Sequence, residues 1–455
     1  MGKYTKIFAV MILTATLLLS ACSGAATSPA TDEKAVTDTG GAEGASDAQP
    51  KAEAPKPAEP TKLSLWTFQE VHAKYYNSMA ESWNAANPDK PIQLEVTTLP
   101  DADMHSKLLI SLQSGVGAPD LSDIEVSKFP NFLRGNIPLA ELNDIIDPVK
   151  ENIVQARVDM YSKEGKYYGV DFHVGASVMY YNKEILDQAG VNPDDIATWA
   201  DFVEAGKTVL AKTSKPMIAV ETIGEWQFWQ MISQQGSDFL DAEGNVILDN
   251  EINVKTVDFL KQLIKDKIAV IAPGGKYHTE DYYGFMNGGG SAAVAMPMWF
   301  MGRFTDYMPD LSGKMIIRPL PSWEPGGNRS AGMGGTGTAV IKSSPNAALA
   351  KEFLAYAKLS KEGNIQIWKQ LGFDPIRTDV WELPELKEEN KFTKYFGTNL
   401  FDTLMEVKDE INTVNIKDKT PQINAAVKTI ALFQAIQEDK DTYTTLKTVS
   451  DVIRK

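Results

Sequence analysis

Tryptophan and arginine side chains gather in one stretch of the second half of the chain. An apolar run ends at Pro297 and is followed at once by Trp299 and Arg303. A crossing rich in proline and glycine then carries Trp323 and Arg329. Flat aromatic faces beside cationic hydrogen-bond donors suit a cleft that stacks on a sugar ring and binds its hydroxyls. We therefore expect these four side chains to bind ligand. For Arg303 and Arg329 the alternatives are a solvated loop charge or a salt bridge between lobes.

Two further tryptophans are candidates for the same cleft. Trp66 follows a strand-like run, where it would serve either as core or as a ligand platform. Trp226 and Trp229 are three residues apart at the start of a helix, so they share one face. We expect one of this pair to be core and Trp226 to face the cleft.

Three polar side chains also stand at predicted strand ends or crossings, namely Glu70, Glu125 and His173. Ligands of open α/β sheets bind beyond the carboxyl ends of strands, which favours a binding role. The alternatives are a solvated loop charge, a salt bridge between lobes, or, for His173, a bond to a backbone carbonyl.

Motifs for catalysis, nucleotides and metals are missing or out of context. Residues 332–337 read G-x-G-x-x-G, but a polar crossing precedes them and a strand-like run follows, whereas the dinucleotide motif needs a strand and then a helix. The four histidines are scattered and no short-spaced ligand set accompanies them. There is no G-x-S-x-G. We expect no catalytic residue, no metal and no cofactor.

The N-terminus predicts secretion and lipid attachment. Lys3 and Lys6 precede an apolar run over 7–19, which is too short to span a bilayer and fits a signal peptide. Cys22, the single cysteine, ends the sequence Leu-Ser-Ala-Cys, which matches the bacterial lipobox. The alternative is a buried or chance cysteine at a small-residue cleavage site. We predict a signal peptide over 1–21 and a diacylglycerol anchor on Cys22.

A polar segment rich in alanine and proline follows, and we predict a flexible tether over 22–61. The remaining residues, about 390, exceed what one hydrophobic core organises, so two lobes are expected. The formal net charge is -15, which argues against nucleic acid and against adhesion to anionic lipid. We expect a monomer held at the membrane by its lipid alone.

Hydrophobic periodicity predicts two α/β lobes. A strand at 63–67, a helix over 71–86 and a strand at 92–96 form a parallel βαβ unit. A second α/β unit begins near Ser177, and Thr198 with Asp201 predicts a helix-capping box. We expect the chain to pass between the lobes about three times, with the cleft at these crossings. The predicted boundaries are 62–172 with 330–375 for lobe 1, and 173–329 with 376–455 for lobe 2.

Several motifs resemble the solute-binding lipoproteins of bacterial carbohydrate ABC importers. The lipobox is joined by Leu65-Trp66-Thr67-Phe68, Ala118-Pro119-Asp120-Leu121, Gly165-Lys166-Tyr167-Tyr168-Gly169-Val170 and Tyr180-Tyr181-Asn182-Lys183-Glu184. A closer likeness, to arabino-oligosaccharide-binding proteins of Firmicutes, rests on Tyr282-Tyr283-Gly284-Phe285-Met286-Asn287, Tyr307-Met308-Pro309-Asp310-Leu311 and Leu371-Gly372-Phe373-Asp374-Pro375.

This resemblance implies a two-lobed, periplasmic-binding-protein-like fold with the ligand between the lobes. It implies a receptor on the outer face of the cell membrane that hands an oligosaccharide to a permease, and an aromatic sugar platform at Trp299. A xylo-, malto- or galacto-oligosaccharide is an alternative ligand. A secreted glycoside hydrolase is the rival from another class, since it too needs a cleft lined by carboxylates.

Overall fold

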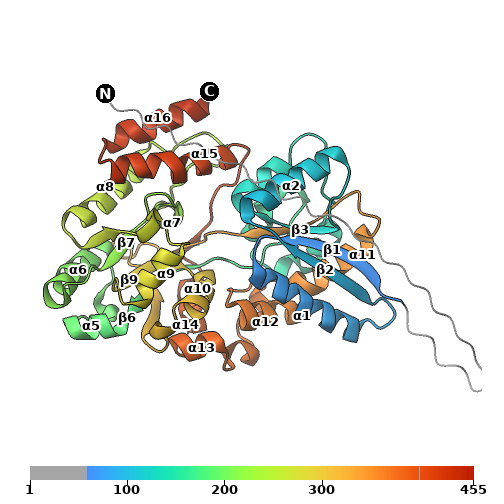
Figure 1. The fold of residues 1–455 in the computed structure, drawn as a ribbon, viewed down its shortest axis with the longest axis horizontal. Coiled ribbons are helices and arrows are strands. Elements are labelled where there is room, and N and C mark those ends of the chain that lie inside the picture. Colours follow the sequence, from blue (N-terminus) through green and yellow to red (C-terminus); the bar gives the residue numbers. More distant parts are fainter. Residues whose placement is uncertain (1–58, 399) are drawn as a thin grey trace, which may run out of the picture. The chain divides into compact units, whose positions relative to one another are not determined.

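Two β-sheets organise the chain, each with its own covering helices (Figure 1). This computed structural model describes residues 59–398 and 400–455, which belong to one compact unit. The predicted signal peptide, Cys22 and all but the end of the predicted tether lie outside the described residues.

The first sheet has the strand order β12-β3-β1-β2. Its strands are β1 (Thr61–Thr67), β2 (Ile92–Thr98), β3 (Leu121–Glu125) and β12 (Thr336–Val340). The first two strands are parallel over their whole length and are joined by α1 (Glu70–Ala86), so the predicted βαβ unit is confirmed. The helix α2 (Asp101–Ser114) ends at Gly115 in the left-handed conformation. The last strand, β12, comes from far along the chain and runs antiparallel to β3.

The second sheet has the order β10-β6-β9-β7-β8. Its strands are β6 (Ser177–Asn182), β7 (Ile218–Val220), β8 (Ala269–Ile271), β9 (Ala293–Pro297) and β10 (Met315–Pro319). Its helices include α5 (Lys183–Ala189), α6 (Trp199–Thr213), α7 (Trp226–Gln234), α8 (Glu251–Lys265), α9 (Glu280–Asn287) and α10 (Met301–Tyr307). The predicted capping box is present, because Thr198 and Asp201 exchange side-chain and backbone hydrogen bonds at the start of α6.

Short elements and the C-terminal third complete the two lobes. They are α3 (Asn143–Ile146), α4 (Ala156–Asp159), β4 (Ser162–Lys163), β5 (Lys166–Tyr167), β11 (Ser330–Ala331), α11 (Ala347–Leu354), α12 (Lys361–Gln366), α13 (Lys391–Phe396), α14 (Leu400–Val407), β13 (Ile411–Asn412), α15 (Thr420–Ala426) and α16 (Thr442–Arg454). Within the described ranges, no helix is both long enough and apolar enough to cross a membrane.

Three segments cross between the lobes and pair with one another: the first at 170–176, the second at 332–338 and the third at 374–375. Backbone bridges join Val170 to Thr338, Ala176 to Gly332 and His173 to Pro375. The hinge is therefore a small bundle of extended segments rather than a single strand, as the two-lobed fold predicts. The residue numbers at which one lobe gives way to the next stay predictions.

A buried ion pair lies beneath the second crossing. Arg157 Nη2 is 2.6 Å from Asp171 Oδ2 and donates to the carbonyl of Gly334 at 2.6 Å. Asp171 Oδ1 accepts the backbone N–H of Thr336 at 3.1 Å. A Cβ at Gly335 would lie 2.3 Å from Tyr161 Oη and 2.6 Å from Asp171 Oδ2, so only glycine fits there. The Arg157–Asp171 pair therefore holds this crossing, and the lack of a side chain at Gly335 lets the backbone approach the pair.

The third crossing makes a pH-dependent prediction about stability. Burial raises the pKa of Asp374 to about 7, and its Oδ2 accepts the N–H of Ala176 at 2.7 Å. Because the folded pKa exceeds that of the unfolded chain, the folded state binds more protons between about pH 4 and 7, and stability falls as pH rises through that window. Asp374→Asn removes this ionisation. We expect its free energy of unfolding, relative to wild type, to rise by about 1–4 kcal/mol between pH 5 and pH 8.

Urea unfolding of both proteins at the two pH values measures that difference. Curves that shift equally with pH in the two proteins would show that Asp374 does not titrate in this window.

Candidate functional site

A cavity of about 720 Å³ is lined by both lobes and by the crossings. Lobe 1, which contains the first sheet, contributes Gln69 and His72 from the end of β1 and the start of α1. It also contributes Glu125 from the end of β3. Lobe 2 contributes the start of α7 and the turn after β9. Gly334 and Gly335 of the second crossing line its floor, so the rejected G-x-G-x-x-G stretch lies at the cavity and runs into strand β12.

The lobe 2 side of the cavity is an aromatic wall of Trp226, His278 and Trp299. The Trp299 ring stacks on His278 at a centroid distance of 5.7 Å and an angle of 20°. It meets Trp226 edge-on at 5.3 Å. The two indoles are half-buried, so they pack against the core while still presenting surface to the cavity. Such a wall offers apolar faces to the C–H side of a sugar.

Trp299 also contacts the hinge. Its Nε1 donates to the carbonyl of Met333 in the second crossing at 3.1 Å. The position of Trp299 follows from Pro297, which ends β9 and is followed by a helical turn. The sequence offered no buried partner for this indole, whereas the structure gives it ring contacts and a hydrogen bond.

One hydrogen bond spans the cavity from lobe to lobe. Arg303 Nη2, on α10, donates to Gln69 Oε1, which lies between β1 and α1, at 3.0 Å. Arg303 has no carboxylate within ion-pair distance in the described part of the chain. Its remaining N–H groups are therefore suited to neutral oxygen acceptors such as hydroxyls.

A paired set of charges occupies another part of the lining. Lys428 Nζ lies 3.6 Å from Glu225 Oε1. Burial alone would lower the pKa of Lys428, but Glu225, Glu125 and Asp101 together raise it. The Glu125 side chain also accepts the backbone N–H of Ser127 at 3.1 Å and so begins a helical turn. These carboxylates hold Lys428 charged at the cavity surface.

Two histidines of the cavity are neutral. Burial lowers the pKa of His173 and of His278 to about 3, and the Arg303 charge adds to the effect at His278. The Nδ1 of His173 is buried and has no hydrogen-bond partner among the described residues. A neutral imidazole has one N–H donor and one bare nitrogen acceptor, so it can form hydrogen bonds with hydroxyls without carrying a charge.

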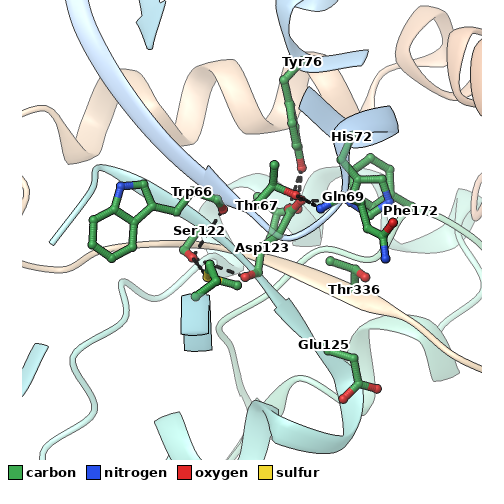
Figure 2. Close-up of polar contacts among 12 residues, drawn as sticks. Trp66, Thr67, Gln69, His72, Tyr76, Ser122, Asp123, Glu125, Phe172 and Thr336 are labelled. Atoms are coloured by element: carbon green, nitrogen blue, oxygen red, sulfur yellow. Dashed lines mark hydrogen bonds and ion pairs between the residues drawn. The ribbon is translucent and has the colours of Figure 1, made fainter. Parts of the chain in front are cut away.

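The cavity brings together five of the predicted residues: Glu125, His173, Trp226, Trp299 and Arg303. The other four lie elsewhere. Trp66 is 8 % exposed, carries Lys107 Nζ 4.4 Å above its ring, and points away from Gln69 and His72 (Figure 2). Alternation along β1 explains this placement, since neighbouring side chains leave opposite faces of a strand.

The remaining three predicted residues have structural contacts or face solvent. Trp323 packs on Trp199 and Phe259 and donates its indole N–H to the carbonyl of Met231, so it lies against the core of its lobe and outside the cavity. Arg329 pairs with Glu410 at 2.6 Å and with Glu406 at 2.5 Å. Glu70 is exposed in the first turn of α1.

Several lining residues gave no signal in the sequence. His278 follows a glycine turn, and a single histidine has no spacing to recognise. Glu225 and Lys428 are about 200 residues apart, so only the fold pairs them. Beneath the cavity, Asp123 binds His72 Nδ1 at 3.0 Å, with Thr67 and Tyr76 on the same carboxylate (Figure 2). No group of three or more metal-ligating side chains occurs among the described residues.

A two-lobed α/β fold with an aromatic, hydrogen-bonding cavity between its lobes is typical of solute-binding proteins. The family model of the bacterial extracellular solute-binding proteins matches residues 69–363, and the chain belongs to that family. The family resemblance seen in the sequence is thereby confirmed.

Named relatives agree with this assignment, and a solved structure shares the fold. The arabinooligosaccharide-binding protein of Bacillus subtilis (strain 168) is 46 % identical, over 97 % of this chain and 96 % of its own. The arabinooligosaccharide-binding protein of Halalkalibacterium halodurans is 52 % identical, over 80 % of this chain and 82 % of its own. The ABC transporter associated binding protein from B. animalis subsp. lactis Bl-04, in complex with beta-1,6-galactobiose, has a TM-score of 0.73 at 19 % identity, over 87 % of this chain and 97 % of that one.

The neutral histidines provide a test of the cavity. We expect the ring resonances of His173 and His278 to stay constant in a ¹H–¹⁵N NMR titration from pH 8 to pH 5, because their pKa values are near 3. Both folded pKa values lie below the unfolded value, so their stabilisation is complete above about pH 6.5 and is lost as pH falls toward 3. A midpoint near 6.5 for either ring would place it in solvent.

Proposed function

We propose that this protein is the extracellular receptor of an ABC importer and that it binds arabino-oligosaccharides without breaking a bond. One observation carries the proposal. The aromatic wall, the neutral histidines and the free donors of Arg303 all face one cavity lined by both lobes. The names of two relatives that match most of the chain supply the sugar class.

The proposed binding mode follows from the lining. The apolar faces of sugar rings stack on the aromatic wall, while Arg303, His173 and His278 exchange hydrogen bonds with hydroxyls. Glu125 and the Glu225–Lys428 pair supply further hydrogen-bonding groups. A ligand that touches both lobes stabilises the closed state by its differential affinity, and the Arg303–Gln69 bond already spans the lobes. Recognition of the closed form by the permease then completes delivery.

The setting of the receptor is part of the proposal. A signal peptide over 1–21, a lipid on Cys22 and a tether to residue 61 would hold a monomer on the outer face of the membrane. Lobe 1 would comprise 62–172 with 330–375, and lobe 2 would comprise 173–329 with 376–455. No nucleic acid, metal or cofactor is required.

Calorimetric titration tests the ligand. We expect arabinobiose or arabinotriose to bind more tightly than xylo-, malto- or galacto-oligosaccharides of equal length. Trp226→Ala removes part of the aromatic wall, and such a truncation costs about 2 kcal/mol, or roughly 30-fold in affinity. Trp299→Ala should lower both affinity and melting temperature, because that indole also packs and bonds to Met333.

Trp323→Ala is the matched control, because this indole lies in the same lobe but outside the cavity. It should lower stability and leave affinity unchanged. Tight binding of a different sugar series would reassign the ligand. Release of reducing ends from arabino-oligosaccharides by the pure protein would favour the hydrolase instead.

The anchor makes a separate prediction. Cys22→Ala removes the thiol that would carry diacylglycerol, and we expect the protein to leave the membrane fraction for the medium. The diacylglycerol group on Cys22 is the only membrane contact proposed, so its loss should release the protein completely rather than partly. Immunoblots of the two fractions measure this, with Ser23→Ala as a control that keeps the thiol. Membrane retention of the Cys22→Ala protein equal to wild type would contradict the lipobox assignment.

A further inference from the structure

Glu221 is a buried carboxylate directly behind the aromatic wall. It follows the last residue of β7, is 2 % exposed and lines the cavity. Among the described residues it has no cation within ion-pair distance. A buried charge without a counter-ion is costly unless hydrogen bonds satisfy it, so its partners reveal what it does.

Its two oxygens bind two different segments, one where the 221–225 loop enters helix α7 and the other in the loop before α9. Oε2 accepts the backbone N–H of Gln227 at 3.1 Å, and Oε1 accepts the backbone N–H of Tyr277 at 3.0 Å. Gln227 is the neighbour of Trp226, and Tyr277 is the neighbour of His278. One carboxylate therefore holds the main chain beside two of the three members of the aromatic wall.

The loop at 222–225 packs closely against this carboxylate and is hydrogen-bonded to the loop that contains Gly275. A Cβ at Gly224 would lie 2.2 Å from Glu221 Oε1. Thr222 and Ile223 donate their backbone N–H groups to the carbonyl of Gly275 at 2.8 and 3.0 Å. A small movement of the carboxylate must consequently move both loops.

We propose that Glu221 is a positioning residue of the sugar site, because it ties the start of α7, which bears Trp226, to the loop bearing His278 and so sets the geometry of the aromatic wall. The effect on sugar binding rests on the proposed function. The effect of Glu221 on the geometry of the aromatic wall does not depend on the proposed function.

Ionisation of Glu221 controls how well it serves both loops. Burial raises its pKa to about 7, with Glu225 adding to the shift and the N–H groups of Tyr277 and Gln227 opposing it. The other titratable groups that face it are the hydroxyls of Tyr277 and Tyr282. An ionised carboxylate accepts on both oxygens, whereas a protonated one turns one oxygen into a donor that faces an N–H. Lower pH should therefore loosen the wall and weaken binding.

The first experiment needs no ligand. We expect the indole N–H resonance of Trp226, assigned by its loss in Trp226→Phe, to titrate between pH 8 and pH 6 with a midpoint near 7. In Glu221→Gln, which keeps the shape but not the ionisation, that resonance should be shifted at pH 8 and constant with pH. Asp238→Asn is the matched control. Burial likewise raises the pKa of Asp238 to about 7, but it binds Trp229 and Asn415 outside the cavity. This control should retain the Trp226 titration.

The second experiment measures arabinotriose affinity at pH 8 and pH 6. Wild type and Asp238→Asn should bind several-fold more weakly at pH 6. Glu221→Gln should bind about tenfold more weakly than wild type at pH 8, as expected for one unsatisfied buried N–H, and show no pH dependence.

A Trp226 resonance that titrates unchanged in Glu221→Gln, or that is constant with pH in wild type, overturns the inference. If Glu221→Gln does not fold, the comparison of wild type with Asp238→Asn decides: a Trp226 titration present in both supports the inference, and one that Asp238→Asn lacks overturns it. Absence of arabinotriose binding by wild type at both pH values, with the resonance titrating as expected, would count against the proposed function and not against the role of Glu221.

Discussion

The buried pair of Arg157 and Asp171 is the interaction on which the rest of the site depends. Both side chains are fully buried, and both reach the second crossing, Arg157 at the carbonyl of Gly334 and Asp171 at the N–H of Thr336. Removing one partner of such a pair costs about 3–5 kcal/mol, because the other charge is left uncompensated. The pair therefore holds the second crossing in one conformation at Gly334 and Gly335, where it forms the floor of the cavity.

From that floor, contacts lead outward to the ligand-facing surface. Met333, next to Gly334, accepts the indole N–H of Trp299, and the indole stacks on His278. Glu221 holds the backbone next to His278 from the other side. Hinge, aromatic wall and supporting carboxylate thus form one connected set of contacts. A ligand that presses on the wall acts on a surface already coupled to the hinge, which is how contact with a sugar can bias lobe closure.

The fold was predictable because its signals are local. Alternating runs with the helix over 71–86 between them predicted the first βαβ unit, and Thr198 with Asp201 predicted the start of α6. The cavity was only half predictable. Glu125, which ends β3, and Trp299, which lies in the turn just after β9, were predictable from their positions in the sequence. Trp66 points to the other face of its strand, and Arg329 has carboxylate partners on a segment about 80 residues away, which no local pattern reveals.

Most charges at the cavity are already satisfied, and this narrows what can confer selectivity. Glu225 faces Lys428, Asp306 faces Lys391, and Glu221 is occupied by backbone N–H groups. A ligand that displaced these bonds would have to replace them, which gains little net free energy. Among the described residues of the lining, the outer N–H groups of Arg303 and the neutral histidines can bond a ligand without breaking an ion pair. Because these donors and acceptors carry fixed directions next to a flat aromatic wall, they discriminate between sugars by the placement of hydroxyls rather than by charge.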